Sequence, residues 1–257
     1  MNEIENMEKA KQMKKSISKG TKIVITVGIV VIAFVTVILV YSNDYYKSEV
    51  SKGDYAAYTS FVIEEFSDGL FIDGGGSSDA IIFYPGGKVE YTAYLPLCTK
   101  LAAEGIDCFL VEMPFHLAIF GSNKAGSIME EYTYDNWYLA GHSLGGAMAA
   151  NYVADNVDEF AGLIMLAAYP TKALVSDNLK VLSVYGNKDE VINREKLKES
   201  SEFVPEHYTE IGLGGANHAG FGNYGIQKGN GEATMDRDKQ QDMAVQYIIK
   251  MINTTYE

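Results

Sequence analysis

The sequence contains little of several residue types on which common functional sites depend. Its 257 residues include two cysteines, four histidines and five prolines, and they show no internal repeat. Zinc sites are usually built from clustered Cys and His ligands, and the sequence has no such cluster. We therefore expect neither a metal nor another cofactor.

Positive charge is scarce outside the N-terminus. The chain has 21 Lys and Arg against 34 Asp and Glu, and its formal net charge is −13. Residues 1–22 hold six lysines and three glutamates, which leaves −16 for the remainder. A body this acidic repels nucleic acid and anionic lipid headgroups, so we expect no DNA or RNA partner.

Apolar residues, in contrast, are plentiful enough for one large core. Hydrophobic residues make up 47% of the chain and aromatic residues 12%. Domains of this length are commonly single. No long tract is compositionally biased, so disorder is expected only at the N-terminus and after the first apolar run.

That first apolar run spans residues 23–41 and reads IVITVGIVVIAFVTVILVY. It contains no charge, and at 1.5 Å per residue it spans about 28 Å, close to the thickness of a bilayer's hydrocarbon core. A buried helix of a soluble protein would have a polar face, and this run has none. The run therefore predicts a transmembrane helix.

A cleaved signal peptide is the alternative to an anchor. Its apolar region is usually shorter and ends in small residues at a processing site. Here the run continues as SNDYYKSEV, with no A-x-A-like pattern and no lipidation cysteine. We therefore expect an uncleaved anchor at 23–41, followed by a stalk at 42–58 and a folded domain at 59–257.

Strand-like and helix-like segments alternate in the expected domain. A hairpin is predicted around Ser67-Asp68-Gly69. Short apolar runs predict strands covered on both faces, and they are Ala80–Tyr84, Cys108–Glu112, Trp137–Ala140, Leu163–Ala167, Val181–Tyr185 and Tyr208–Ile211. Helices are expected near Glu90–Ala103, Asn123–Glu131, Leu144–Asp155, Glu190–Glu202 and Asp238–Ile252. This rhythm predicts an α/β fold with a mainly parallel, doubly wound sheet and a site at the carboxyl ends of its strands.

One motif in this pattern carries chemistry. Gly141-His142-Ser143-Leu144-Gly145 follows the strand WYLA and opens the helix LGGAMAANYVAD. A strand that turns directly into a helix holds its serine in a strained conformation above the sheet, and its close packing requires the flanking glycines. A Gly-rich turn is the plainer interpretation, but the position between strand and helix favours Ser143 as a nucleophile.

A nucleophilic serine needs a base, which has to be found among four histidines. His142 lies inside the motif, His116 precedes the serine, and His207 begins the last expected strand. His218 lies beyond that strand in the loop GLGGANHAGFGNYG, which is long enough to reach back over Ser143. His218 is therefore the predicted base.

The acid and the oxyanion donors follow from the strand ends. Asp189 comes just after the strand KVLSVYG and is the predicted acid that orients the base, with Glu190 in reserve. The backbone N–H of Leu144 is one expected oxyanion donor. The second is expected in the turn after AIIFY, where Gly87 is preferred and Lys88 is next.

With these residues assembled, the chain resembles proteins of the α/β-hydrolase fold, of the dienelactone-hydrolase-like, lid-less kind. The resemblance covers about residues 78–250 through FYPGGKVEYTAYLPL, MPFHLAIFG, AGHSLGGAMAANY, LAAYP, VYGNKDEV and GGANHAGFGNYG. It implies Ser143 as nucleophile, Asp189 as acid and His218 as base. Gly220 departs from the family pattern, in which a larger polar residue often follows the His-Ala pair.

The sequence leaves little room for a lid over the site. Only AYPTKALVSDNL separates two expected strands where larger lipases of this fold carry a cap. Phe115 and His116, in PFHLAIFG, and Phe221, after the base, are expected to line a shallow apolar pocket. Packing under the loop is the alternative for these side chains.

An uncapped pocket of this kind suits small or short-acyl esters, or acyl groups on a cell-surface polymer. The expected function is a membrane-anchored serine hydrolase that acts through an acyl-enzyme. Thioester or amide cleavage, transfer to an acceptor other than water, and a non-catalytic extracellular binding module remain open. Nothing in the sequence indicates an oligomeric state.

The two cysteines leave a further question open. Cys98 is expected on a helix and Cys108 on the next strand, at a separation that permits a disulfide in an exported domain. Both lie in apolar surroundings, where free cysteine is common as a small core residue.

The lysines before the apolar run predict the topology of the chain. By the positive-inside rule, residues 1–22 lie in the cytoplasm and the folded domain lies outside the cell membrane. Protease added to intact cells or protoplasts is expected to remove the folded domain and to leave the N-terminal tail protected. Full protection, with the envelope permeable to protease, would overturn this orientation.

Overall fold

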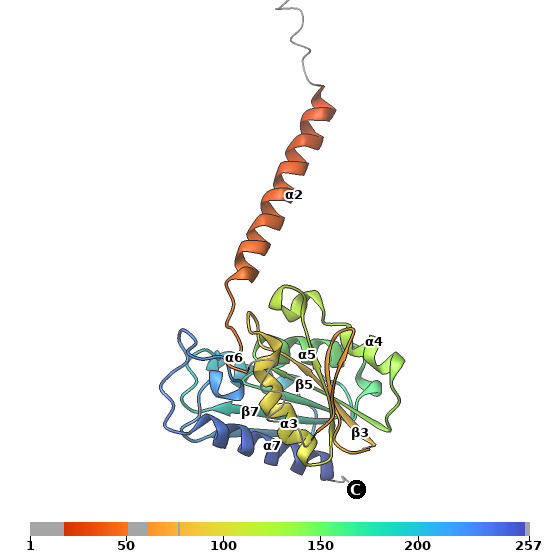
Figure 1. Ribbon diagram of the computed structural model, residues 1–257, viewed down its shortest axis with the longest axis vertical. Helices are drawn as coiled ribbons and strands as arrows, with labels where there is room; N and C mark the ends of the chain where they lie inside the picture. Colours follow the sequence, from red (N-terminus) through yellow and green to blue (C-terminus); the bar gives the residue numbers. More distant parts are fainter. Residues whose placement is uncertain (1–17, 51–60, 77, 255–257) are drawn as a thin grey trace, which may run out of the picture. The chain divides into compact units, whose positions relative to one another are not determined.

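The computed structural model describes residues 18–50, 61–76 and 78–254, in two units divided after Asn43 (Figure 1). The first unit is helix α2, Lys19–Asn43. Its 18-residue window of highest mean hydropathy reaches 3.2, and none of that window is buried. Among the described residues it is the one helix long and apolar enough to cross a membrane, and it contains the predicted span 23–41.

The second unit is built on an eight-stranded sheet in the order β1-β2-β4-β3-β5-β6-β7-β8. The first two strands form the predicted hairpin, and β2 pairs antiparallel with β4. All other neighbours are parallel, as predicted. The strands are β1 (Ile63–Phe66), β2 (Gly69–Ile72), β3 (Asp79–Tyr84), β4 (Asp107–Val111), β5 (Asn136–His142), β6 (Gly162–Leu166), β7 (Lys180–Gly186) and β8 (Tyr208–Leu213).

Each central strand is apolar on both faces because helices cover both. On β3, Ile81 and Phe83 face one half of the core, and Ala80 and Ile82 face the other. Helices α3 (Leu95–Ala103) and α7 (Arg237–Asn253) pack into the first half, whereas α4 (Lys124–Glu131) and α5 (Leu144–Asp155) pack into the second (Figure 1). The doubly wound fold is therefore confirmed.

Two predicted helices begin later than the sequence pattern indicated. The segment from Glu90 opens with a 3₁₀ turn, η2 (Tyr91–Tyr94), before α3. Helix α6 (Arg194–Glu199) begins four residues after Glu190, because the preceding backbone N–H groups bind Asp189 instead. Asn193 caps this helix by accepting from the Lys196 N–H at 3.0 Å. The other short 3₁₀ turns are η3 (Pro114–His116), η4 (Ala118–Phe120), η5 (Val157–Glu159), η6 (Ser200–Phe203) and η7 (Ala219–Phe221).

Residues 44–50, which the sequence places in a stalk, pair with the body of the domain. We call this segment the strap. The Tyr46 N–H donates to the Lys88 carbonyl at 2.7 Å, and the Glu90 N–H donates to the Tyr46 carbonyl at 3.0 Å. The strap ends at Val50, which is 9% exposed and belongs to the core. The rest of the expected stalk, residues 51–58, lies outside the described residues.

The two cysteines are free and buried. Cys98 and Cys108 both lie in the half of the core beneath α3 and α7. Burial raises the pKa of the Cys108 thiol well above its ordinary value. Of the two possibilities left open by the sequence, the structure has the pair of core thiols.

Candidate active site

Ser143 occupies the turn between β5 and α5, as its motif predicts. Its backbone has φ 52° and ψ −121°, a left-handed conformation that L-residues adopt only when their surroundings enforce it. The Ser143 N–H donates to the Leu166 carbonyl at the end of β6, at 2.9 Å. Strained backbone of this kind is typical of a nucleophile held above a sheet.

The glycines around Ser143 are required by close packing of backbone on backbone. A Cβ atom on Gly145 would lie 2.3 Å from the Pro85 carbonyl oxygen, and one on Gly141 would lie 2.6 Å from the Gly145 carbonyl carbon. Real Cβ atoms do not approach backbone atoms so closely. The start of α5 therefore lies directly against the turn that follows β3.

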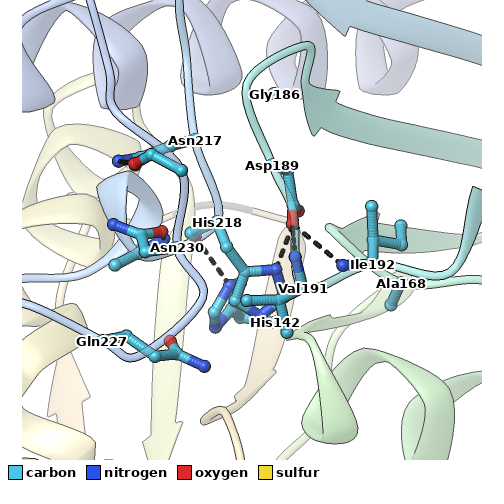
Figure 2. A network of polar contacts seen from close by, with 12 residues as sticks. His142, Ala168, Gly186, Asp189, Val191, Ile192, Asn217, His218, Gln227 and Asn230 are labelled. Carbon is cyan, nitrogen blue, oxygen red and sulfur yellow. Dashed lines mark hydrogen bonds and ion pairs between the residues drawn. The ribbon is translucent and has the colours of Figure 1, made fainter.

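Asp189 lies in the turn after β7, with its side chain 0% exposed. One carboxylate oxygen, Oδ1, accepts from the N–H groups of Val191 at 2.8 Å and Ile192 at 2.9 Å. The other, Oδ2, is 2.7 Å from Nδ1 of His218 (Figure 2). Three hydrogen bonds thus fix the carboxylate, whereas Glu190, the reserve acid, is exposed.

His218 follows β8 and is 1% exposed. Since Asp189 can only accept, the His218 Nδ1 carries the proton of their hydrogen bond, and Nε2 carries a lone pair. Nε2 is buried and has no hydrogen-bond partner among the residues that the structure describes. A buried acceptor without a partner is costly, so this atom is the natural site for a proton from a reacting group.

Ser143 and His218 line one cavity of about 330 Å³. The structure thus brings the predicted base into a hydrogen bond with the predicted acid, and into the same cavity as the predicted nucleophile. A hydrogen bond between the Ser143 hydroxyl and Nε2 of His218 is not formed in the described structure. Such contacts are often loose without substrate.

The loop that carries His218 is held by amide side chains (Figure 2). Asn230 accepts from the Ala219 N–H at 2.6 Å, and Asn217 accepts from the Gly220 N–H at 3.0 Å. A Cβ atom on Gly220 would lie 2.1 Å from Oε1 of Gln240, which is fully buried. Gln240 therefore fills the space that the larger residue of the family pattern would need.

The expected oxyanion donors lie next to each other. A Cβ atom on Gly87 would lie 2.9 Å from Cδ2 of Leu144, so the turn after β3 contacts the first residue of α5. The Leu144 N–H, at the helix start, has no acceptor within the helix. The N–H of Gly86 is bonded to the Tyr94 hydroxyl and that of Lys88 to the His116 carbonyl, which favours Gly87 over Lys88.

The three expected pocket residues do not line the cavity beside Ser143. Phe221 has no exposed surface and packs in the core, with its ring centroid 5.8 Å from that of His142. Phe115 and His116 line a different cavity of about 260 Å³, and the His116 ring stacks on Tyr45. The structure thus places all three residues outside the cavity beside Ser143, because Phe221 packs into the core and Phe115 and His116 line the other cavity.

The residues that do line the cavity come mainly from two loops that sequence analysis missed. One is the connection after β6, described throughout and without helix or strand, and the other is the turn after Asp189. Both follow carboxyl ends of parallel strands, and this topological rule was the available signal. The lining residues besides Ser143 and His218 are Leu144, Ala147, Ala167, Ala168, Tyr169, Thr171, Val191, Ile192 and Asn193.

Comparisons with known proteins agree with this architecture. The model of the alpha/beta hydrolase family matches residues 80–242. No curated protein is similar enough to match.

Solved structures share the fold at low sequence identity. A predicted CIB-like hydrolase from Thermoplasma acidophilum is 13% identical, with a TM-score of 0.55 over 74% of this chain and 99% of its own. Est1E from Butyrivibrio proteoclasticus, solved with ferulic acid bound, is 14% identical, with a TM-score of 0.53 over 69% of this chain and 91% of its own. Alpha/beta hydrolase domain-containing protein 10 from mouse is 11% identical, with a TM-score of 0.55 over 75% and 98%.

The packing at the turn predicts the effect of a single methyl group. Gly145→Ala is expected to lower the free energy of unfolding by about 2–3 kcal/mol, because the new Cβ meets backbone that cannot move without shifting β3. Gly214→Ala is the matched control, since a Cβ there meets nothing within 4 Å. Chemical denaturation of both variants measures the difference, and equal stabilities would contradict the packing argument.

Proposed function

The chain belongs to the alpha/beta hydrolase family, and we propose that it is a membrane-anchored serine hydrolase of small carboxylic esters. The observation that carries the proposal is the state of His218. Its Nδ1 is hydrogen-bonded to Asp189, and its Nε2 is buried without a partner among the described residues. The same histidine lines one cavity with Ser143. A histidine in this arrangement can act as a general base.

In the proposed mechanism, Ser143 is the nucleophile. Its Oγ attacks the ester carbonyl carbon while its proton passes to Nε2 of His218, and Asp189 stabilises the resulting imidazolium. The N–H groups of Gly87 and Leu144 bind the oxyanion. The protonated His218 then gives its proton to the departing alkoxide, the carbon–oxygen bond to the alcohol breaks, and an acyl-enzyme remains.

A water molecule completes the cycle. It loses a proton to Nε2 of His218 as its oxygen bonds to the acyl carbon, and the same oxyanion donors bind the second tetrahedral intermediate. The intermediate collapses when the bond to Ser143 Oγ breaks and the proton returns to the serine. Asp189 stays ionised throughout and keeps the imidazole in one orientation.

The cavity supports a short, uncharged acyl group. Its volume is about 330 Å³, and small side chains such as those of Ala147, Ala167 and Ala168 line it. Among its lining residues, the titratable groups are the His218 imidazole and the Tyr169 phenol. A carboxylate or ammonium on the acyl group would lose its hydration there without gaining a partner.

The anchor and its orientation are part of the proposal. Helix α2 supports a membrane span, and the lysines before it support a cytoplasmic tail with the catalytic domain outside the cell. The lid-less, dienelactone-hydrolase-like resemblance fits the short connection after β6. An acyl group on a cell-surface polymer is therefore as good a substrate as a free small ester.

The triad is tested by removing each member. Ser143→Ala is expected to abolish labelling by a fluorophosphonate probe and to lower ester turnover at least about 10³-fold. Asp189→Asn is expected to lower turnover strongly, because the histidine loses the partner that fixes its tautomer. Glu190→Gln, a matched change at the neighbouring exposed acid, should leave turnover unchanged. Full labelling of Ser143→Ala would assign the nucleophile to another residue, whereas a wild type that the probe does not label would favour a non-catalytic binding module.

The pocket is tested with a series of acyl esters of one alcohol. Turnover is expected to be highest for acetyl to butyryl esters, to fall with chain length, and to be low for the charged hemisuccinate. Because no helical cap follows β6, no rate jump is expected at the micellar transition. A preference for long-chain lipid esters with such a jump would contradict the proposed substrate, and selective turnover of thioesters or amides would reassign the bond that is cleaved.

A further inference from the structure

We propose that Tyr94 and His142 are positioning residues, which join the oxyanion turn, Pro85–Gly87, to the backbone of the base, His218, as one rigid unit. The inference rests on the proposed function, because it gives a task to two buried side chains that the mechanism leaves unused. Neither residue lines the cavity beside Ser143. Each acts through the groups that it holds.

The unit is a chain of three hydrogen bonds. The Gly86 N–H lies 3.1 Å from the Tyr94 hydroxyl, this hydroxyl lies 2.7 Å from Nδ1 of His142, and Nε2 of His142 lies 3.0 Å from the His218 carbonyl oxygen. Figure 2 shows the last of these contacts, between His142 and His218. The chain thus begins beside Gly87, the expected oxyanion donor, and ends on the base.

The partners fix the direction of every bond. A carbonyl only accepts, so Nε2 of His142 must carry the ring proton and donate it to His218. In the neutral ring Nδ1 is then an acceptor, and it takes the Tyr94 O–H. The hydroxyl oxygen in turn accepts from the Gly86 N–H. Each donor therefore has one acceptor.

Burial keeps the chain in this protonation state. Tyr94 is 0% exposed and His142 is 1% exposed. Burial, with the nearby His218 as a further cause, holds the pKa of His142 well below its ordinary value, so the ring stays neutral. Burial also raises the pKa of Tyr94 far above its ordinary value, so the hydroxyl keeps its proton.

Close packing holds this series of hydrogen bonds in place. A Cβ atom on Gly86 would lie 2.7 Å from both Nδ1 of His142 and the Tyr94 hydroxyl oxygen. The glycine is therefore required by this hydrogen bond, and not only by the turn. With its ring held by Asp189 and its carbonyl held by His142, the base is fixed at two points.

The protein offers a matched control variant at Tyr84. This tyrosine is also 0% exposed, and its hydroxyl also accepts one backbone N–H, from Ala125 at 2.8 Å, while it donates to the Ser122 carbonyl at 2.8 Å. Tyr84→Phe therefore also loses one bond accepted from a backbone N–H and one bond donated by the hydroxyl, although its acceptor is a backbone carbonyl and that of Tyr94 is an imidazole nitrogen. The Tyr84 backbone directly precedes the oxyanion turn, but its side chain packs in the opposite half of the core from that of Tyr94.

The test compares Tyr94→Phe, His142→Leu and their double variant in the full-length protein. Tyr94→Phe is expected to lower kcat by about tenfold with KM unchanged, the scale of one to two lost hydrogen bonds felt in the transition state. The double variant should be no slower than the slower single variant, because the residues act as a unit. Tyr84→Phe should lower Tm to a similar extent with kcat unchanged.

Equal kcat losses for Tyr94→Phe and Tyr84→Phe would overturn the proposal, and so would multiplicative effects in the double variant. Hydrogen exchange gives a readout that needs no activity. In Tyr94→Phe, exchange is expected to rise in segments 85–89 and 216–221 together, and unchanged exchange in the second would also overturn it. If the wild type neither turns over esters nor reacts with the fluorophosphonate, the proposed function is contradicted instead. The hydrogen-exchange comparison still tests whether the three hydrogen bonds join the two segments.

Discussion

The structure depends on one steric constraint, the contact of backbone with backbone where β5 turns into α5. Pro85 and Gly145 approach so closely that no side chain fits between them, and the serine between strand and helix is forced into a left-handed conformation. Because β3 and β5 are neighbours in the sheet, the same contact brings the turn after β3 against the first N–H of the helix. The proposed nucleophile and the proposed oxyanion donors are thus positioned by a single packing contact.

The proposed acid and base come from the other half of the sheet, on two loops that contact each other. Gly186, at the end of β7, has no space for a Cβ because the Ala216 carbonyl oxygen would lie 2.3 Å from it. The Lys188 N–H bonds to that same carbonyl at 2.8 Å. The turn that carries Asp189 and the loop that carries His218 therefore form one layer over the strand ends, and their 2.7 Å hydrogen bond is its inner contact.

The sequence predicted which polar groups meet at this site better than it predicted the shape of the cavity. Ser143, Asp189 and His218 each follow a strand whose apolar run is easy to identify, so their order and topology predicted their neighbourhood. The lining of the cavity depends on which way each loop turns after its strand, and no local pattern encodes that direction. Phe221 illustrates the difference. Its sequence position predicted a pocket wall, but its side chain packs in the core against His142. The strap was missed for a related reason, since its partners are between about 40 and 190 residues away and its own composition is polar.

The strap has a consequence for where the chain can be cut between helix α2 and the sheet. The Ser48 N–H donates to the Glu90 carboxylate at 2.9 Å, and the Glu49 N–H donates to the Asn223 carbonyl at 2.7 Å. A cut before Asp44 leaves these bonds in place, whereas a cut after Val50 removes a core residue and the partners of Glu90 and Asn223. Proteolytic release of the domain and the choice of a first residue for soluble expression thus depend on the same contacts. The viable boundary lies immediately after the helix, not at the start of the sheet.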